Sequence, residues 1–140
     1  MKTFDEWVEH YNKHSGEVFR EHDGCKMFFI PDRGFCELRF CEDLLIFYQL
    51  SGDAKFWHDF GLVLCGIMGL KAMGTICTRN IKAYLRWWNY RITKEVKLKE
   101  GVQYFAEHKE HKWKVRCSPA WNKETGDTAY YVTEYLEVEE

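Results

Sequence analysis

An apolar stretch, Leu44–Tyr48, passes through a short polar segment into a helical pattern, and this succession restricts the fold more than any other part of the chain. A short apolar run bounded by turn residues predicts a strand in the middle of a sheet. The next stretch, Ala54–Met68, carries apolar side chains at helical spacing, and Gly69 follows where helices commonly end. We therefore expect a sheet with at least one helix packed on it.

The remaining sequence predicts two further helices and a series of strands. Helical spacing covers Thr3–His14, which opens with a capping-box pattern, and Asn80–Trp88. Alternation or apolar runs predict strands over Lys26–Ile30, Phe35–Cys41, Leu70–Thr78, Arg91–Leu98, Val102–Phe105, Lys112–Cys117 and Ala129–Val138. The first three strands of the chain are expected to form an antiparallel meander, and the last ones an extra C-terminal β hairpin. The predicted fold is a single α+β domain over residues 1–140, with a mixed, mostly antiparallel twisted sheet flanked by helices.

The composition restricts both the class of protein and its partners. A hydrophobic fraction of 46% and an aromatic fraction of 17% are enough for a packed core, which excludes global disorder. The net charge of −2 makes nucleic acid an unlikely partner, because non-specific binding to phosphates requires a basic excess. The chain shows no secretory pattern and no apolar run long enough for a bilayer, so we expect a cytoplasmic location without membrane contact.

The cysteine and histidine residues give no clear metal or disulfide pattern. The six cysteines include no C-x-x-C pair and lie mostly in apolar segments, so we expect buried free thiols. His10 and His14 are four residues apart on the predicted first helix, and His22 and Cys25 follow. Helical pairs of this kind can bind zinc, but the pair lacks the glutamate of H-E-x-x-H. We therefore predict surface histidines and no metal site.

The C-terminal half combines basic and aromatic residues. The stretch from His108 to Arg116 places Lys112, Lys114 and Arg116 on one side of a predicted strand, which is typical of a solvated sheet face. A contact patch for an acidic or nucleic-acid partner is the alternative. Most of the aromatic residues are expected in the core, and exposed ones beyond that number would indicate a protein interface.

The segment between the central strand and the helix is the strongest candidate for a binding site. Backbone N–H groups at the start of a helix lack partners within the helix, and together with the helix dipole they can bind phosphate. Gly52 and Ala54 would let a ligand approach the backbone closely, and Lys55 could add a positive charge. The alternative is a plain strand-to-helix connection in which Ser51 or Asp53 caps the helix.

Two short motifs carry a resemblance to a known family. The first follows the pattern Q/R-x-x-G-x-G/A and the second the pattern N-x-x-A-x-x-x-aromatic, and the matching residues are Gln49, Gly52, Ala54, Asn80, Ala83 and Trp87. Over Lys26–Ile92 the sequence resembles the acyl-CoA-binding core of GNAT N-acyltransferases. More loosely, the whole chain resembles small GNAT-like proteins encoded by phages and prophages.

The resemblance implies an N-acyltransferase that uses acetyl-CoA or another acyl-CoA, in the host cytoplasm or in the virion if the protein is phage-encoded. A backbone N–H near Tyr48 would hold the thioester carbonyl. Glu37 or His58 would deprotonate the amine, and Tyr84 would donate a proton in place of the family tyrosine. The residues implied to bind the coenzyme are Gln49, Ser51, Gly52, Asp53, Ala54, Lys55 and Asn80.

Three departures from the family pattern support an alternative function. The loop before the first motif is short, Asp53 places a negative charge beside the expected phosphates, and Trp87 stands near the position of the family's tyrosine. The alternative is a non-catalytic GNAT-fold phage protein that acts by binding another protein, as a virion component, an accessory protein or an inhibitor of host defence.

Overall fold

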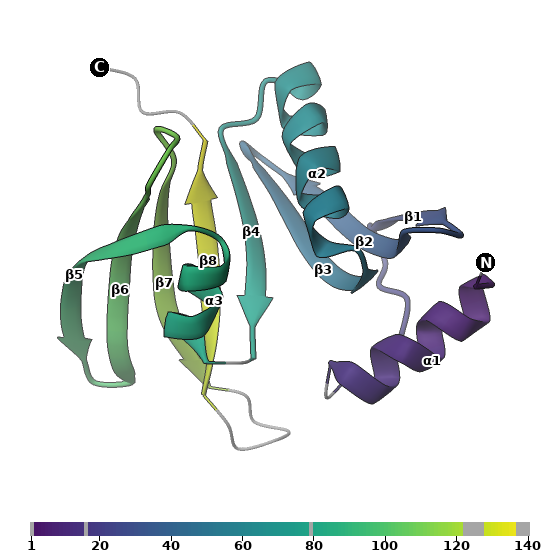
Figure 1. Cartoon of the computed structure of the whole chain (residues 1–140), viewed down its shortest axis with the longest axis horizontal. Coiled ribbons are helices and arrows are strands. Elements are labelled where there is room, and N and C mark those ends of the chain that lie inside the picture. Colours follow the sequence, from purple (N-terminus) through teal and green to yellow (C-terminus); the bar gives the residue numbers. More distant parts are fainter. Residues whose placement is uncertain (1, 16, 79, 122–127, 137–140) are drawn as a thin grey trace. The chain divides into compact units, whose positions relative to one another are not determined.

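The computed structural model describes residues 2–15, 17–78, 80–121 and 128–136, and the chain divides into two compact units, Met1–Leu70 and Lys71–Glu140. The first unit contains α1 (Phe4–His14), β1 (Lys26–Ile30), β2 (Gly34–Cys41), β3 (Leu44–Gly52) and α2 (Ala54–Met68) (Figure 1). The second unit contains β4 (Ala72–Cys77), α3 (Ile81–Trp87), β5 (Tyr90–Leu98), β6 (Gly101–His108), β7 (Lys114–Trp121) and β8 (Thr128–Tyr135).

In the first unit, β1, β2 and β3 form an antiparallel meander with helices on both faces. The alternation of a strand sends Phe35 and Cys36 of β2 to opposite faces. Phe35 packs against Tyr11 of α1, with ring centroids 5.8 Å apart. Phe28, which pairs with Cys36 in the register, contacts Phe60 of α2 with centroids 5.0 Å apart. The meander is therefore the middle layer of this unit.

The helices begin where the sequence predicts caps. Thr3 and Glu6 form the capping box at the start of α1, with both reciprocal hydrogen bonds present. Asp53 caps α2, and Gly69 ends it in the left-handed conformation. The meander, both helix positions and the capping box are thus confirmed.

Strand β3 is longer than the sequence predicts. The prediction ended this strand at Tyr48 and placed a loop after it, but the strand runs on to Gly52. Its last four residues pair with Gly34–Glu37 of β2, and backbone pairing keeps them extended. The expectation of a loop over residues 49–52 is therefore wrong, because the partner strand continues beside it.

The second unit is an antiparallel sheet in the order β4-β8-β7-β6-β5. Helix α3 packs on one face of it through Ile81 and Leu85, which share a buried cluster with strand residues. The buried strand residues of that cluster are Cys77, Tyr90, Tyr104, Ala106, Val115, Cys117 and Val132. This cluster is the core of the second unit.

The α+β class and the mostly antiparallel pairing are confirmed. The predicted C-terminal hairpin corresponds to β7 and β8, but β8 also pairs with β4 on its other side. The predicted strand Ala129–Val138 ends partly outside the described residues. The GNAT-like arrangement and the single domain remain predictions.

The cysteines are free thiols, as expected, and most of them are buried. Burial raises the pKa of Cys36 and of Cys117 to about 12, so these thiols stay protonated at neutral pH. Among the described residues there is no group of three or more His, Cys, Asp or Glu side chains placed to hold a metal ion. None of the described helices has the length and apolar character needed to cross a membrane.

Candidate functional site

A buried carboxyl group on β2 organises the polar centre of the first unit. Glu37 is 2% exposed and lies beside Gln49 in the β2–β3 register. The side chain lies on the same face of the meander as Phe35, which is the face that carries α1. A carboxylate in such a position requires several donors, because an unpaired buried charge is strongly destabilising.

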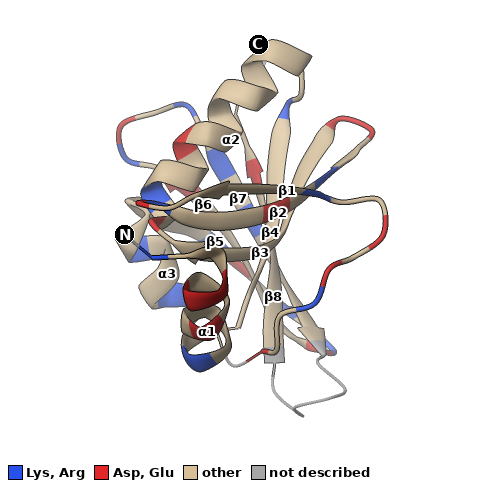
Figure 2. Ribbon diagram, turned by 90° about the vertical axis from the view of Figure 1, so that its right-hand side faces the viewer, with Lys and Arg blue, Asp and Glu red and all other residues tan. Residues whose placement is uncertain are grey.

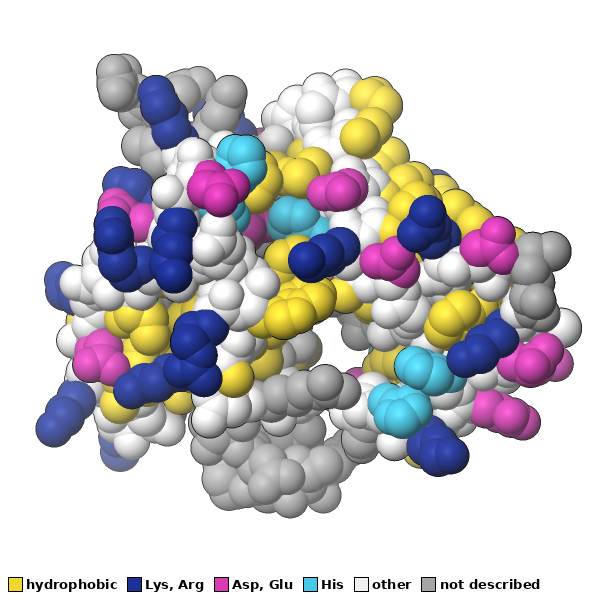
Figure 3. Space-filling view, in the orientation of Figure 1, with side chains coloured by type: hydrophobic (Ala, Val, Ile, Leu, Met, Phe, Trp, Pro, Cys, Tyr) yellow, Lys and Arg dark blue, Asp and Glu magenta, His cyan; other side chains and the backbone are white. Residues whose placement is uncertain are grey.

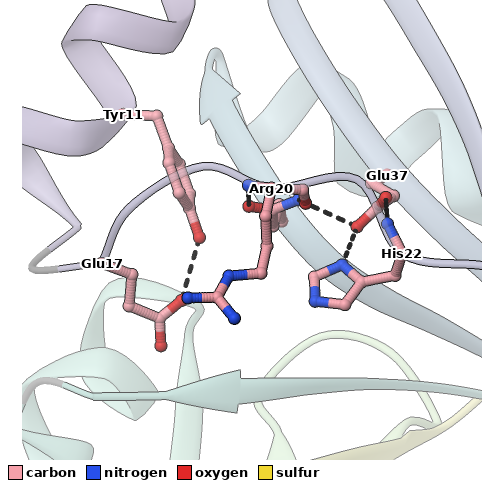
Figure 4. A network of polar contacts seen from close by, with 6 residues as sticks. Tyr11, Glu17, Arg20, His22 and Glu37 are labelled. Atoms are coloured by element: carbon pink, nitrogen blue, oxygen red, sulfur yellow. Dashed lines mark hydrogen bonds and ion pairs between the residues drawn. The ribbon is translucent and has the colours of Figure 1, made fainter.

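His22, in the loop before β1, supplies two of these donors (Figure 4). Its backbone N–H donates to Glu37 Oε2 over 2.8 Å, and its ring Nδ1 lies 2.7 Å from Glu37 Oε1. This contact assigns the proton to Nδ1 and leaves Nε2 as an acceptor. The His22 side chain is 37% exposed whereas that of Glu37 is 3% exposed, so the histidine connects the buried carboxylate to the surface.

Gln49 completes the surroundings of the carboxylate. Its Nε2 donates to Glu37 Oε1 over 2.9 Å and to the carbonyl of Arg20 over 2.6 Å. Its Oε1 accepts the backbone N–H of Arg20 over 3.2 Å. Both polar atoms of the Gln49 side chain are thus hydrogen-bonded within the protein, and these bonds hold the loop that carries His22.

The loop that carries His22 is also hydrogen-bonded to α1, at the end where the loop begins. The hydroxyl of Tyr11 donates to Glu17 Oε2 over 3.0 Å, and Asn12 Oδ1 accepts the backbone N–H of Phe19 over 2.7 Å. Burial raises the pKa of Tyr11 above its ordinary range, and the nearby Glu17 adds to that effect. Contacts at both ends therefore hold the His22 loop in one position.

A β-bulge lies beside this pair. Glu37 pairs with Gln49 and Leu38 pairs with Phe47, so Tyr48 has no partner on β2. Bulges re-aim side chains and are frequent next to active sites. Tyr48 is 37% exposed, and its ring lies edge-on to that of His22, with centroids 5.3 Å apart. The bulge brings an irregular backbone segment next to an accessible imidazole.

This arrangement can accept a proton from a bound molecule. A histidine whose Nδ1 is held by a carboxylate presents Nε2 as a base, and the carboxylate stabilises the imidazolium that forms. The sequence predicted Glu37 or His58 as the base. In the structure Glu37 is enclosed by donors, whereas His22 beside it reaches the surface.

The start of α2 has the geometry of the capped connection that was the alternative to a phosphate loop. Asp53 Oδ1 accepts the N–H of Phe56 over 3.1 Å, and Asp53 Oδ2 lies 2.7 Å from the guanidinium of Arg33. The bond from Phe56 is the main cause that lowers the pKa of Asp53, and the bond from Arg33 follows. The carboxylate of this chain thus occupies the place where an anion would bind a helix N-terminus.

Gly52 is exposed, but backbone of the turn before β2 occupies the position that a Cβ would take. Its φ of +104° suits glycine, and a Cβ there would lie 2.2 Å from the carbonyl oxygen of Arg33. That oxygen also accepts the N–H of Asp53 over 2.9 Å and the indole N–H of Trp57 over 3.0 Å. A glycine here therefore allows the end of β3 to pack closely on the turn before β2, and this packing accounts for the glycine without a coenzyme.

The other predicted coenzyme residues are distributed over both units. Ser51 is buried and donates to the carbonyl of Trp7 over 3.0 Å. Ala54 is the first residue of α2, and Lys55 next to it is exposed. Asn80 belongs to the second unit, where it caps α3 by accepting the N–H of Ala83 over 3.0 Å.

The other predicted catalytic residues belong to elements other than those that carry the His22–Glu37 pair. His58 lies on α2, with its Nδ1 4.0 Å from Asp59. Tyr84 lies on α3 in the second unit, and burial, with Glu134 next, raises its pKa. A raised pKa weakens a phenol as a proton donor. The structure brings together Glu37 and Gln49 from the predicted set.

Two residues important to this region were missed as site residues. His22 had been considered only as a zinc ligand, and Arg33 was not among the predicted site residues. The sequence offers little signal for either, because Glu37 lies 15 residues from His22 and Asp53 lies 20 residues from Arg33. The chain matches no protein-family model, and no curated protein or solved structure is significantly similar to it.

Proposed function

We propose that the first unit transfers an acyl group from a thioester to an amine, with His22 as the base. The observation that carries the proposal is the 2.7 Å contact between buried Glu37 and accessible His22. The bulge at Tyr48 adds support, since irregular backbone at this place is where the GNAT resemblance expects the thioester carbonyl to bind.

The reaction needs one proton acceptor and one leaving thiolate. The amine nitrogen attacks the thioester carbon, the C–N bond forms, and the C–S bond breaks. His22 Nε2 takes the proton that the amine loses, and Glu37 stabilises the resulting imidazolium. No covalent intermediate with the protein is required.

The contacts at the N-terminus of α2 affect which thioester can serve as the acyl donor. Asp53 and Arg33 already satisfy each other at the place expected for the coenzyme diphosphate. Acetyl-CoA binding at that place would require Asp53 to move, whereas a small thioester without a diphosphate would not. The proposed substrates are therefore thioesters in general, with acetyl-CoA as the donor that the resemblance implies.

The test measures thiol release from acetyl-CoA and from S-acetyl-N-acetylcysteamine, with spermidine and a lysine peptide as acceptors. We expect His22→Gln to reduce the rate at least tenfold, with partial rescue by added imidazole, and His14→Gln, an exposed counterpart, to leave it unchanged. Equal rates for wild type and His22→Gln, or no thiol release from either donor by folded protein, would refute the proposal.

Protein binding is the second candidate function, and α2 favours it. Its C-terminal half has no charged residues (Figure 2), and Val63, Ile67 and Met68 are 60%, 76% and 49% exposed. Hydrophobic side chains are visible at the surface around the end of α2 in Figure 3. An exposed apolar stripe of this kind is typical of a surface that packs against a helix of another protein. If the first test fails, Ile67→Glu is the variant that tests this function.

A further inference from the structure

The sheet of the second unit has one face that α3 does not cover. The core residues of β6 and β7, such as Tyr104 and Cys117, point toward α3. Their neighbours along each strand, Phe105 and Arg116, must point the other way. We call this surface the open face, and its polar and aromatic members on β5 to β8 include Arg91, Lys94, Gln103, Phe105, Glu107, Lys114, Arg116, Ser118, Tyr131, Thr133 and Tyr135.

Basic and aromatic side chains alternate across the open face. The register pairs Lys94 with Phe105, and Phe105 with Arg116, in one row across three strands. Lys94 Nζ lies 5.8 Å from the ring centroid of Phe105. The Arg116 guanidinium lies 5.9 Å from the ring of Tyr135, which pairs with Lys114. Each of these rings therefore has a cation beside it.

Tyr131 is the most accessible aromatic side chain of the open face. It is 55% exposed and pairs with Ser118 on one side. On the other side it pairs with Ile76 of β4, which is 52% exposed. A half-exposed ring on a sheet surface offers a π-face to a flat ligand.

The charge of the second unit differs in sign from that of the first. The second unit contains 13 Lys and Arg against 10 Asp and Glu, a balance of +3, while the first contains 7 against 12, a balance of −5. Residues 82–116 alone carry 10 basic against 4 acidic side chains. The net charge of the whole chain therefore conceals a basic region, part of which is visible as Lys and Arg over the second unit in Figure 3.

We propose that the open face binds single-stranded nucleic acid. Bases stack on Tyr131, Phe105 and Tyr135, while Lys94 and Arg116 contact phosphates. Exposed aromatic side chains on a sheet, flanked by cations, are the combination that binds unpaired bases with little dependence on sequence. An acidic peptide would use the cations but gain little from the ring faces, so the aromatic side chains favour a nucleic acid.

The test measures binding of full-length protein to a fluorescent oligo(dT) 20-mer by anisotropy at several salt concentrations. Stacking of one base on an aromatic ring is worth about 1–3 kcal/mol, so Tyr131→Ala should weaken binding about fivefold or more. Tyr131→Phe keeps the ring and should bind like the wild type, which separates stacking from misfolding.

The charge component has its own variants. Lys94→Ala combined with Arg116→Ala should lower the slope of log K against log salt by about 1.4, since each phosphate contact to a single strand contributes about 0.7. Arg86→Ala, an exposed change on α3, is the matched control and should leave both affinity and slope nearly unchanged.

Three outcomes would overturn the proposal. The first is no binding of oligo(dT) at low salt. The second is polyglutamate of similar charge binding as tightly as oligo(dT) with Tyr131→Ala unchanged, which would assign an acidic peptide to the open face. The third is tighter binding of a duplex than of the single strand. Tighter binding of oligo(dT) than of polyglutamate, reduced by Tyr131→Ala, supports the proposal.

Discussion

The two units both bury a glutamate, and they do so with opposite consequences. In the first unit, Glu37 is held by N–H donors, and one of its partners, His22, reaches the surface. In the second unit, Glu134 accepts a hydrogen bond from Tyr90, and both residues are less than a tenth exposed. Glu37 thus orients an accessible imidazole, whereas Glu134 accepts its bond from a side chain that is itself buried.

The two units also differ in charge and in how far helices cover their sheets. The first unit is acidic, both faces of its meander carry helices, and three of its exposed apolar side chains lie on α2. The second unit is basic, and its helix covers one face of the sheet. The first unit is therefore built around a polar centre between helix and sheet, and the second around an apolar core with an accessible sheet surface.

The largest effect is expected from a change that forces β3 away from its neighbouring turn. Gly52→Ala puts a methyl group 2.2 Å from the carbonyl oxygen of Arg33 at a φ of +104°. We expect a loss of about 3 kcal/mol or more in the free energy of unfolding, measured by urea denaturation. Gly101→Ala in the second unit meets a side-chain atom of Pro119 at 3.3 Å and should cost clearly less. Equal losses would contradict the packing described for Gly52.

Removal of the buried carboxylate of the first unit should have the next largest effect. Glu37→Ala leaves the donors of His22 and Gln49 without their acceptor, and we expect a loss of about 3 kcal/mol. Glu107→Ala in the second unit removes a surface ion pair with Lys114 and should cost about 1 kcal/mol or less. Thermal denaturation measures both. A minor effect of Glu37→Ala would show that the network does not hold the His22 loop.

The buried Tyr90–Glu134 pair of the second unit should contribute less to the free energy of unfolding than Glu37 does. Tyr90→Phe deprives Glu134 of one donor, and we expect a loss of about 1–2 kcal/mol. Burial, with Glu134 next, raises the pKa of Tyr90, so the folded protein retains the phenolic proton above pH ~10, where the unfolded chain loses it. Stability therefore falls as the pH rises above that value, and Tyr90→Phe should remove part of this slope. An unchanged alkaline slope in Tyr90→Phe would contradict the assignment.

The smallest effect is expected at the exposed cap of α2. Hydrogen bonds from Phe56 and Arg33 lower the pKa of Asp53, so its contribution is present above the unfolded pKa of about 4 and is lost as the pH falls below it. The melting temperatures of wild type and Asp53→Ala should differ slightly at pH 7 and converge in acid. Asp32→Ala, in the exposed turn before β2, is the control.

The Asp53→Ala variant also tests which acyl donor the protein uses. Asp53→Ala exposes the first N–H groups of α2 and frees the guanidinium of Arg33. If acetyl-CoA uses this place, its affinity should rise in Asp53→Ala, as measured by calorimetry, while the rate with S-acetyl-N-acetylcysteamine stays the same. Unchanged acetyl-CoA affinity would place the coenzyme elsewhere or exclude it.

Local patterns were sufficient for most elements and for few of the site contacts. The capping box at Thr3 and the apolar spacing of α2 are short-range signals, and both were confirmed. The segment from Gln49 to Gly52 was wrongly predicted as a loop, because glycine is also typical of loops. Its pairing with β2 is a contact between distant residues, which no local pattern shows.

The α+β class, the order of helices and strands, and the predicted caps follow from residues within a few positions of one another, so local patterns were enough to predict them. The orientation of His22 by Glu37, the contact of Arg33 with Asp53, and the placement of Phe105, Tyr131 and Arg116 on one face of a sheet could be seen only in the folded chain. Hydrogen bonds, ion pairs and strand register join residues far apart in the chain. Those contacts form only when the backbone has folded and the polar groups that it buries must find partners.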